Sequence, residues 1–212
     1  MVRNLLLGAV LTIAAPNLAI VGASWICRRR RDDAPPALPG LPNLRVVDDR
    51  VWRGAAPATE GYRSLAAAGR RTIVDLRAET WVRVDEALLR DLGLRRTSLP
   101  IRDGQVPTPD DVHRFVQIVD DADSAVFLHC GAGVGRTGSM AAAYLAATGG
   151  IRGGDALVRT LAVGPPSLEQ LAFVARLDGT VVPRVHPVVV AISRLLDAPR
   201  RAWARLRPRP AA

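Results

Sequence analysis

One junction near the middle of the chain restricts the possible folds more than any other feature. Residues 125–129 have the sequence AVFLH, a short apolar stretch typical of a buried strand. A loop follows with three glycines among residues 131–135, and residues 137–147 are then rich in alanine and favour a helix. A strand that turns tightly into a helix is a building block of α/β proteins with parallel sheets. We therefore expect this architecture.

The central region continues the same alternation of short apolar stretches and helix-forming stretches. A hairpin is predicted from residues 44–47 and 51–53, and further strands from residues 72–76, 94–99 and 125–129. Helices are predicted at residues 60–68 and 85–92, after the cap formed by Thr108, and at residues 137–147. The fold class that follows is α/β, with a central, mostly parallel sheet flanked by helices.

The charge of the chain lies at its two ends. The 212 residues carry 29 basic and 20 acidic side chains, for a net charge of +9. Residues 34–183 hold as many arginines as acidic residues, so this region is neutral. A nucleic-acid-binding domain is expected to carry a basic surface. We therefore predict no nucleic-acid partner.

The N-terminal segment is a long apolar run. Residues 5–26 carry no charged side chain, which is enough length for a helix to cross a bilayer, and arginines occupy positions 28–31. We predict a transmembrane anchor at residues 1–27 and a basic, proline-rich linker at residues 28–43. The positive-inside rule then places the domain that follows in the cytoplasm of a single-pass membrane protein. A cleaved signal peptide is the alternative.

The C-terminal tail, residues 181–212, is basic. Its residues 187–196 are mostly apolar, and residues 200–210 are rich in arginine. Two predictions for this tail stay open. It is either a solvated tail or a basic amphipathic segment that lies on anionic lipid. The folded domain between linker and tail is predicted at residues 44–180.

The glycine-rich loop has the residues needed to bind a phosphate group. Its glycines let the backbone curl until several N–H groups converge, and the helix that follows adds its positive N-terminal end. Cys130 would lie at the floor of this cup, where positive surroundings favour the thiolate. Arg136 can bind two phosphate oxygens with its planar fork, and Thr137 can donate a hydrogen bond to the sulfur. His129 is expected to orient the loop.

Displacement at phosphorus also requires an acid that protonates the leaving oxygen. Asp103 is the candidate, because it lies in a loop with glycine and proline that follows the strand at residues 94–99. A plain turn residue is the alternative reading of Asp103. Asp110 and Asp111 stand at a helix start and fit capping better.

These residues together resemble the protein-tyrosine-phosphatase superfamily. Residues 129–138, HCGAGVGRTG, reproduce its signature of His-Cys, five residues, Arg, Ser or Thr, and Gly. The loop around Asp103, with the pattern Pro-x-x-Asp-x-x-x-Pro, is similar to the compact dual-specificity branch. Residues 51–57 and 72–77 resemble the entry segment of small microbial members. The resemblance spans roughly residues 44–178.

The resemblance implies a role for each residue of the site. Cys130 would form a phosphocysteine, Arg136 would hold the phosphoryl group, and Asp103 would act first as acid and then as base. The phosphate would bind to the loop backbone of Gly131, Ala132, Gly133, Val134 and Gly135 beside Arg136. Gln170 resembles a position near the attacking water, with an ordinary helix-surface glutamine as the alternative. No cofactor and no metal are expected.

The predicted function is that of a membrane-anchored protein phosphatase. Phosphotyrosine is the main expected substrate, with phosphoserine and phosphothreonine as further candidates. Ala132 and Val134 favour a phosphoprotein, because lipid-directed relatives often carry basic residues there. A phospholipid phosphatase, acting for example on phosphatidylglycerol phosphate or a phosphoinositide, is the enzymatic alternative. A non-catalytic, membrane-bound phosphate-binding module is the alternative from another class.

Overall fold

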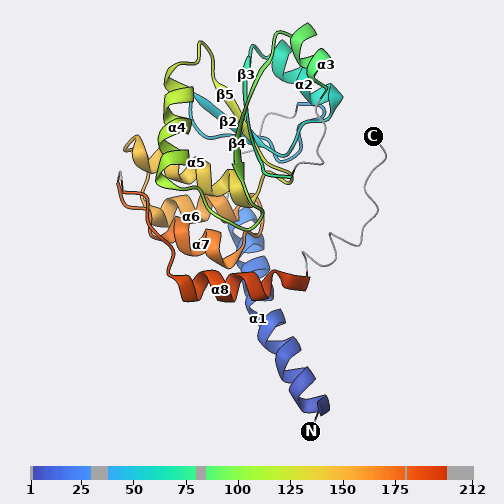
Figure 1. Ribbon diagram of the computed structural model, residues 1–212, viewed down its shortest axis with the longest axis vertical. Coiled ribbons are helices and arrows are strands. Elements are labelled where there is room, and N and C mark those ends of the chain that lie inside the picture. Colours follow the sequence, from blue (N-terminus) through green and yellow to red (C-terminus); the bar gives the residue numbers. More distant parts are fainter. Residues whose placement is uncertain (1, 30–37, 80–84, 180, 200–212) are drawn as a thin grey trace.

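The computed structural model describes residues 2–29, 38–79, 85–179 and 181–199 (Figure 1). Its strands are β1 (Arg45–Val46), β2 (Val51–Gly54), β3 (Thr72–Arg77), β4 (Arg95–Ile101) and β5 (Val126–His129). Its helices are α1 (Val2–Arg29), α2 (Thr59–Ala67), α3 (Glu86–Asp91), α4 (Pro109–Asp120), α5 (Gly135–Ala147), α6 (Gly153–Leu161), α7 (Leu168–Ala175) and α8 (Pro187–Leu196).

The strands form one mixed sheet in the order β1-β2-β5-β3-β4. β1 and β2 form the predicted antiparallel hairpin, and β2, β5, β3 and β4 run parallel to one another. The predicted α/β class with a mostly parallel sheet is therefore correct. In the pairing register, His129 at the end of β5 lies between Gly54 of β2 and Asp75 of β3. Side chains that follow these strands consequently meet at one edge of the sheet.

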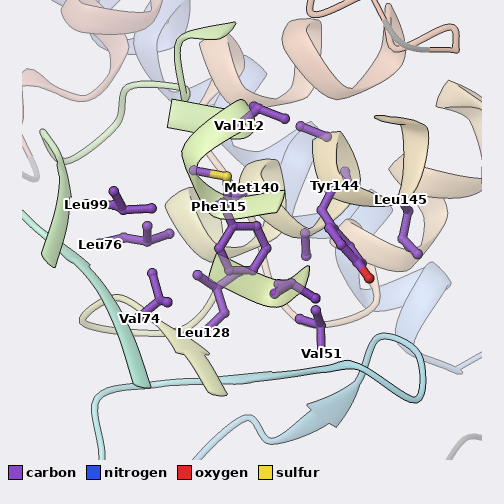
Figure 2. Packing of buried hydrophobic residues seen from close by; sticks show 14 of the residues in the cluster. Val51, Val74, Leu76, Leu99, Val112, Phe115, Leu128, Met140, Tyr144 and Leu145 are labelled. Carbon is purple, nitrogen blue, oxygen red and sulfur yellow. The ribbon is translucent and has the colours of Figure 1, made fainter. Parts of the chain in front are cut away.

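Helices cover both faces of the sheet. On one face, α4 and α5 enclose a core in which Phe115 packs edge-to-face on Tyr144, with ring centroids 5.6 Å apart (Figure 2). On the other face, α2 and α3 cover a smaller cluster that includes Leu65, Leu89 and Phe127. α5 is buried along almost its whole length, which its alanine-rich sequence permits because small side chains allow close packing on all sides.

The start of α4 matches the predicted cap. The Thr108 hydroxyl accepts a hydrogen bond from the Asp111 backbone N–H at 3.2 Å, and the Asp111 carboxylate accepts one from the Thr108 N–H at 2.9 Å. This reciprocal arrangement is a capping box. Asp111 therefore belongs to the helix start, as predicted.

The predicted transmembrane anchor is wrong. Among the residues that the structure describes, no helix has both the length and the apolar character required to cross a membrane. The prediction of a single-pass membrane protein with a cytoplasmic domain depends on this anchor and is therefore wrong as well. The physical reason lies in the polar groups of α1, which bind the folded domain: the Ser24 hydroxyl donates to the Leu161 carbonyl at 2.7 Å, and Arg28 Nη2 donates to the Val163 carbonyl at 2.8 Å.

The C-terminal region also differs from a purely solvated tail. α8 packs against α7 and α1, and the Ser193 hydroxyl accepts a hydrogen bond from the Glu169 N–H at 3.0 Å. Asn17 of α1 donates to the Leu196 carbonyl at the end of α8 at 3.4 Å. Residues 200–212, the arginine-rich end of the tail for which contact with anionic lipid is one prediction, lie outside the described residues, as do residues 30–37 of the predicted linker.

Candidate active site

The loop between β5 and α5 has a backbone that requires glycine at one position. Gly133 has φ of +70°, a left-handed conformation that residues with a Cβ rarely adopt. A Cβ added at Gly133 would lie 2.3 Å from the carbonyl carbon of Gly54. Loop and strand β2 are therefore in direct backbone contact. Cys130 begins this loop and is 3% exposed.

Four consecutive carbonyls of the loop are held from its outer side. The donors all come from residues 43–56, around the first hairpin. The Ala56 N–H donates to the Gly131 carbonyl at 3.0 Å, and Asn43 Nδ2 to the Ala132 carbonyl at 2.9 Å. Arg53 Nη2 donates to the carbonyls of Gly133 at 2.7 Å and Val134 at 3.2 Å. In a planar trans peptide the N–H points opposite to the C=O, so the four N–H groups that follow face the other side, where an anion would bind.

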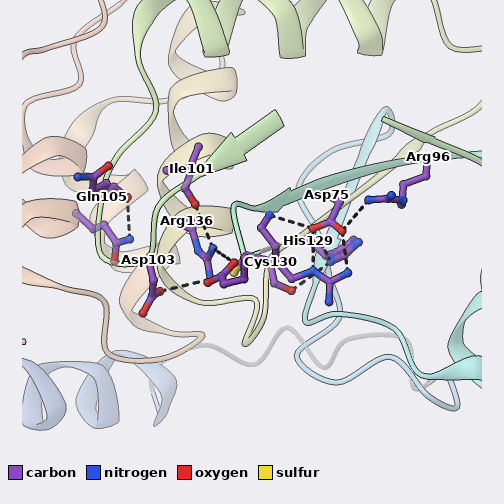
Figure 3. A network of polar contacts seen from close by, with 11 residues as sticks. Asp75, Arg96, Ile101, Asp103, Gln105, His129, Cys130 and Arg136 are labelled. Atoms are coloured by element: carbon purple, nitrogen blue, oxygen red, sulfur yellow. Dashed lines mark hydrogen bonds and ion pairs between the residues drawn. The ribbon is translucent and has the colours of Figure 1, made fainter. Parts of the chain in front are cut away.

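Arg136 lies in the first turn of α5 and is 5% exposed. Its Nη1 donates to Glu79 Oε2 at 2.9 Å and to the Ile101 carbonyl at 3.1 Å, and its Nη2 lies 3.4 Å from Asp103 Oδ1 (Figure 3). Burial works against the charged guanidinium, but the hydrogen bond to Glu79 and the charge of Cys130 keep the pKa of Arg136 above its usual value. A permanent cation therefore stands at the loop.

Asp103 reaches the same point from the loop after β4. Its side chain is 51% exposed, and its carboxylate faces Arg136 (Figure 3). The loop is fixed from α7, because the Ser167 hydroxyl donates to the Gly104 carbonyl at 2.9 Å and Gln170 Nε2 donates to the Gln105 carbonyl at 3.0 Å. The structure thus brings Asp103, Arg136 and the cysteine loop together, as the sequence predicts.

Gln170 does not lie on a helix surface. It is 2% exposed, and its Oε1 accepts a hydrogen bond from the Ser167 N–H at 2.9 Å within a capping box. A Cβ added at Gly135 would lie 2.2 Å from this Oε1, so the amide packs directly on the cysteine loop. Gln170 therefore connects the loop of Asp103 with the loop of Cys130. Its role beside an attacking water stays a prediction.

His129 is fully buried behind the loop. Burial lowers the pKa of His129 to about 4, against the opposing effect of the Asp75 carboxylate, so the ring is neutral near pH 7. Its Nδ1 lies 3.2 Å from the Cys130 carbonyl and 3.9 Å from Asp75 Oδ1. Asp75 is itself bound by Arg77 at 2.7 Å and by Arg96 at 3.3 Å (Figure 3). The role of His129 in orienting the loop stays a prediction.

The Thr137 side chain is completely buried in the first turn of α5. Within the described part of the chain, its hydroxyl has no hydrogen-bond partner. The predicted bond to the Cys130 sulfur stays a prediction.

As for metals, the described residues contain no group of three or more His, Cys, Asp or Glu side chains arranged to hold an ion.

A protein-family model decides the family. The model described as "DSP-PTPase phosphatase fused to NAD+ Kinase" matches residues 40–175, which is more than half of the chain. The chain belongs to this family. The predicted resemblance to dual-specificity and tyrosine phosphatases is therefore confirmed.

Curated relatives of this phosphatase match over shorter stretches. "Probable NAD kinase 2, chloroplastic" from Oryza sativa subsp. japonica is 36% identical over 96 residues, which is 42% of this chain and 10% of the rice protein. "Dual specificity protein phosphatase CDC14C" from Homo sapiens is 39% identical over 61 residues, which is 29% of this chain and 14% of the human protein. The chain thus matches only a small part of each relative.

Solved structures of phosphatases share the fold. A crystal structure of P. aeruginosa TpbA, a Cys-to-Ser variant in complex with pTyr, has a TM-score of 0.59 and 21% identity, over 79% of this chain and 98% of that one. The structure of PTPMT1 in complex with PI(5)P has a TM-score of 0.52 and 20% identity, over 74% of this chain and 98% of that one. At these identities the likeness concerns the fold.

Three residues that surround the site were not predicted as functional. Asn43 and Arg53 hold the loop carbonyls, and Glu79 holds Arg136. The signal for Arg53 was its position within a short strand whose other residues are mostly apolar. Glu79 follows β3 at the same sheet edge as Cys130, which the topology alone could have suggested.

Proposed function

We propose that this chain is a cysteine-dependent phosphatase of phosphorylated proteins, acting on phosphotyrosine and also on phosphoserine or phosphothreonine. The observation that carries the proposal is the convergence of three groups. Cys130 begins a loop in which the carbonyls of residues 131–134 all accept hydrogen bonds. Arg136 lies in the first turn of the helix that follows, and Asp103 Oδ1 lies 3.4 Å from Arg136 Nη2. A thiolate, a fixed cation and an acid at one anion site are the groups that phosphoryl transfer through a thiophosphate requires.

The reaction runs in two steps. The Cys130 thiolate attacks phosphorus and forms an S–P bond, while the bond to the leaving oxygen breaks and Asp103 gives its proton to that oxygen. Water then attacks phosphorus, Asp103 takes the proton from the water, and the S–P bond breaks to restore the thiolate. In both steps the loop N–H groups and Arg136 stabilise the charge on the three phosphoryl oxygens.

Replacement of the nucleophile tests the mechanism. We expect Cys130→Ser to abolish hydrolysis of p-nitrophenyl phosphate while binding of phosphate or vanadate persists, because the serine hydroxyl is not ionised near neutral pH. Cys27→Ser is the matched control, since Cys27 is the other cysteine of the chain and lies on α1. Wild-type turnover in the Cys130 variant would exclude the mechanism. Binding without turnover in the wild-type chain would support the non-catalytic module instead.

The residues at the loop favour a protein substrate. Ala132 and Val134 add no positive charge beside the phosphate site. A polyanionic inositol headgroup carries further phosphates, which would find no such partners there. Phosphate release from matched phosphotyrosine and phosphoserine peptides would rank the two classes of protein substrate, and no release from either peptide would count against the proposal.

A phospholipid monoester is the second candidate, and one observation favours it. A groove of about 340 Å³ lies between α1, α8 and the loop before α7. Its apolar walls are Ile13, Ile20, Val21, Pro165, Pro166 and Leu196. Asp197, which also lines it, contacts the loop of the acid, since a Cβ on Gly104 would lie 3.3 Å from its carboxylate. An apolar chain near the reacting phosphate would fit this groove.

Chain length separates the two candidates. For a lipid substrate, kcat/KM should rise from a glycerol phosphate to short-chain phosphatidylglycerol phosphates in solution, because each methylene group buried in the groove adds favourable free energy. Ile20→Asp should remove that rise without changing turnover of p-nitrophenyl phosphate. Equal rates at all chain lengths would exclude the lipid.

A further inference from the structure

Arg53 is an unusual residue for its position. It lies on β2, where its backbone pairs with Leu128 of the central strand β5, and it is 5% exposed. The neighbouring Val51 is completely buried. An arginine is rarely buried in a sheet without a specific partner. The chain must therefore gain something from the guanidinium at this place.

The environment of Arg53 opposes its charge. Burial lowers the pKa of Arg53 to about 10, and the charge of Cys130 offsets only part of this effect. Among the described residues its Nε has no hydrogen-bond partner. The burial of Arg53 is therefore not explained by hydrogen bonds that satisfy all of its donors. Its contacts lie instead in the cysteine loop and in the first turns of α5.

The contacts of Arg53 are with backbone atoms. One nitrogen, Nη2, donates to two successive carbonyls, those of Gly133 at 2.7 Å and Val134 at 3.2 Å. The guanidinium also lies against α5, because a Cβ on Gly138 would be 3.4 Å from Nη2. It therefore occupies the space between β2, the second half of the loop and the start of α5.

We propose that Arg53 is a positioning residue of this active site. Its guanidinium holds the carbonyls of Gly133 and Val134 away from Cys130. The N–H groups of the same two peptide bonds, those of Val134 and Gly135, are thereby kept directed at the phosphate. Its positive charge also stabilises the nearby thiolate from behind the loop. The proposal rests on the proposed function, because it assigns Arg53 to the same phosphate site.

Two substitutions separate the charge of Arg53 from its geometry. In Arg53→Met both are lost, and we expect the dissociation constant for phosphate or vanadate to rise at least about tenfold. We also expect the pH at which half of Cys130 is alkylated by iodoacetamide to move upward, since a nearby positive charge is removed. Arg53→Lys restores the charge, but the lysine side chain is one bond shorter than the reach of Nη2 to the two carbonyls. Alkylation should therefore recover while phosphate affinity does not.

Arg50 supplies the matched control. It lies in the same hairpin and also caps backbone carbonyls with Nη2, but those of Val119 and Ala122 at the end of α4. Arg50→Met should lower the melting temperature and leave phosphate affinity and the alkylation profile unchanged. If Arg53→Met does not fold, Arg53→Lys still gives both readings.

Two results would overturn the role of Arg53. The first is wild-type phosphate affinity together with a wild-type alkylation profile in Arg53→Met. The second is full recovery of phosphate affinity in Arg53→Lys, because the role requires both carbonyls to be held. Binding and alkylation do not depend on turnover, so they test Arg53 even if no substrate is hydrolysed and the proposed function itself fails.

Discussion

Glu79 holds Arg136 in place from outside the phosphate loop, with Oε2 accepting a hydrogen bond from Nη1 at 2.9 Å. The Ile101 carbonyl accepts a second hydrogen bond from the same nitrogen at 3.1 Å. With Nη1 fixed in this way, the guanidinium has little freedom to rotate. Its orientation is thus set before a phosphate arrives, which reduces the entropy lost on binding.

Loss of Glu79 should weaken phosphate binding. In Glu79→Ala we expect roughly tenfold lower affinity for phosphate or vanadate, because Arg136 must then be ordered by the ligand itself. Isothermal titration of the Cys130→Ser background measures this directly. Glu86→Ala is the control, since Glu86 also pairs with an arginine, Arg96 at 3.0 Å, but outside the loop. Equal affinity in the Glu79 and Glu86 variants would contradict the role of Glu79.

Asp103→Asn should affect substrates according to their leaving groups. An asparagine cannot give a proton to the leaving oxygen, so kcat should fall by about 10²–10⁴-fold for an alkyl phosphate. The fall should be far smaller for p-nitrophenyl phosphate, whose leaving group needs little protonation. The slope of log kcat against leaving-group pKa measures the difference. A uniform loss across the series would assign the acid to another residue.

Gly133→Ala should destabilise the protein, and Gly131→Ala should not. The left-handed backbone at Gly133 costs an alanine about 1–2 kcal/mol, and the contact with Gly54 adds to this. At Gly131 an added Cβ meets nothing closer than 3.9 Å. Thermal unfolding of the two variants gives the comparison. Similar melting temperatures would mean that the loop does not keep this backbone.

Acid should destabilise the fold through His129. Burial holds the pKa of folded His129 at about 4, whereas an unfolded histidine has a pKa near 6.5, so the unfolded state binds the extra proton as pH falls between these values. The stability that the neutral His129 contributes is present above about pH 6.5 and is lost toward pH 4, by at most about 1.4 kcal/mol per pH unit. Urea unfolding at several pH values measures the slope.

A variant isolates this contribution. His129→Asn cannot be protonated in this range, so its free energy of unfolding should depend less on pH between 6.5 and 4, even if the variant is less stable at pH 7. His113→Asn is the control, because His113 is exposed on α4. An unchanged slope in the His129 variant would show that other groups cause the acid sensitivity.

The sequence predicted the parts of the site that depend on local chemistry. The spacing of Cys130 and Arg136 between a strand and a helix specifies the loop, and a Gly/Pro-containing loop after a strand located Asp103. Local patterns also identified the sheet strands and the cap at Thr108. These features follow from residues close to one another in the chain.

Features that depend on distant residues were not predicted. Glu79 and Arg53 lie 57 and 80 residues from their partners, and nothing in the spacing of either residue indicates the contact. The apolar run at residues 5–26 was misread for the same reason. The Ser24 hydroxyl within this run donates to a carbonyl of α6 that lies 137 residues later in the chain, and the run itself gives no indication of this partner.

The docking of α1 changes where the catalytic unit begins. A chain shortened to the matched residues 40–175 would leave the carbonyls of Leu161 and Val163 without Ser24 and Arg28. The next residue, Gly164, packs against Val134, since a Cβ there would lie 2.8 Å from the valine side chain. Removal of the residues outside the matched range would therefore delete the helix that binds the segment packed against Val134 of the phosphate loop. The shortened enzyme would not be equivalent to the whole one.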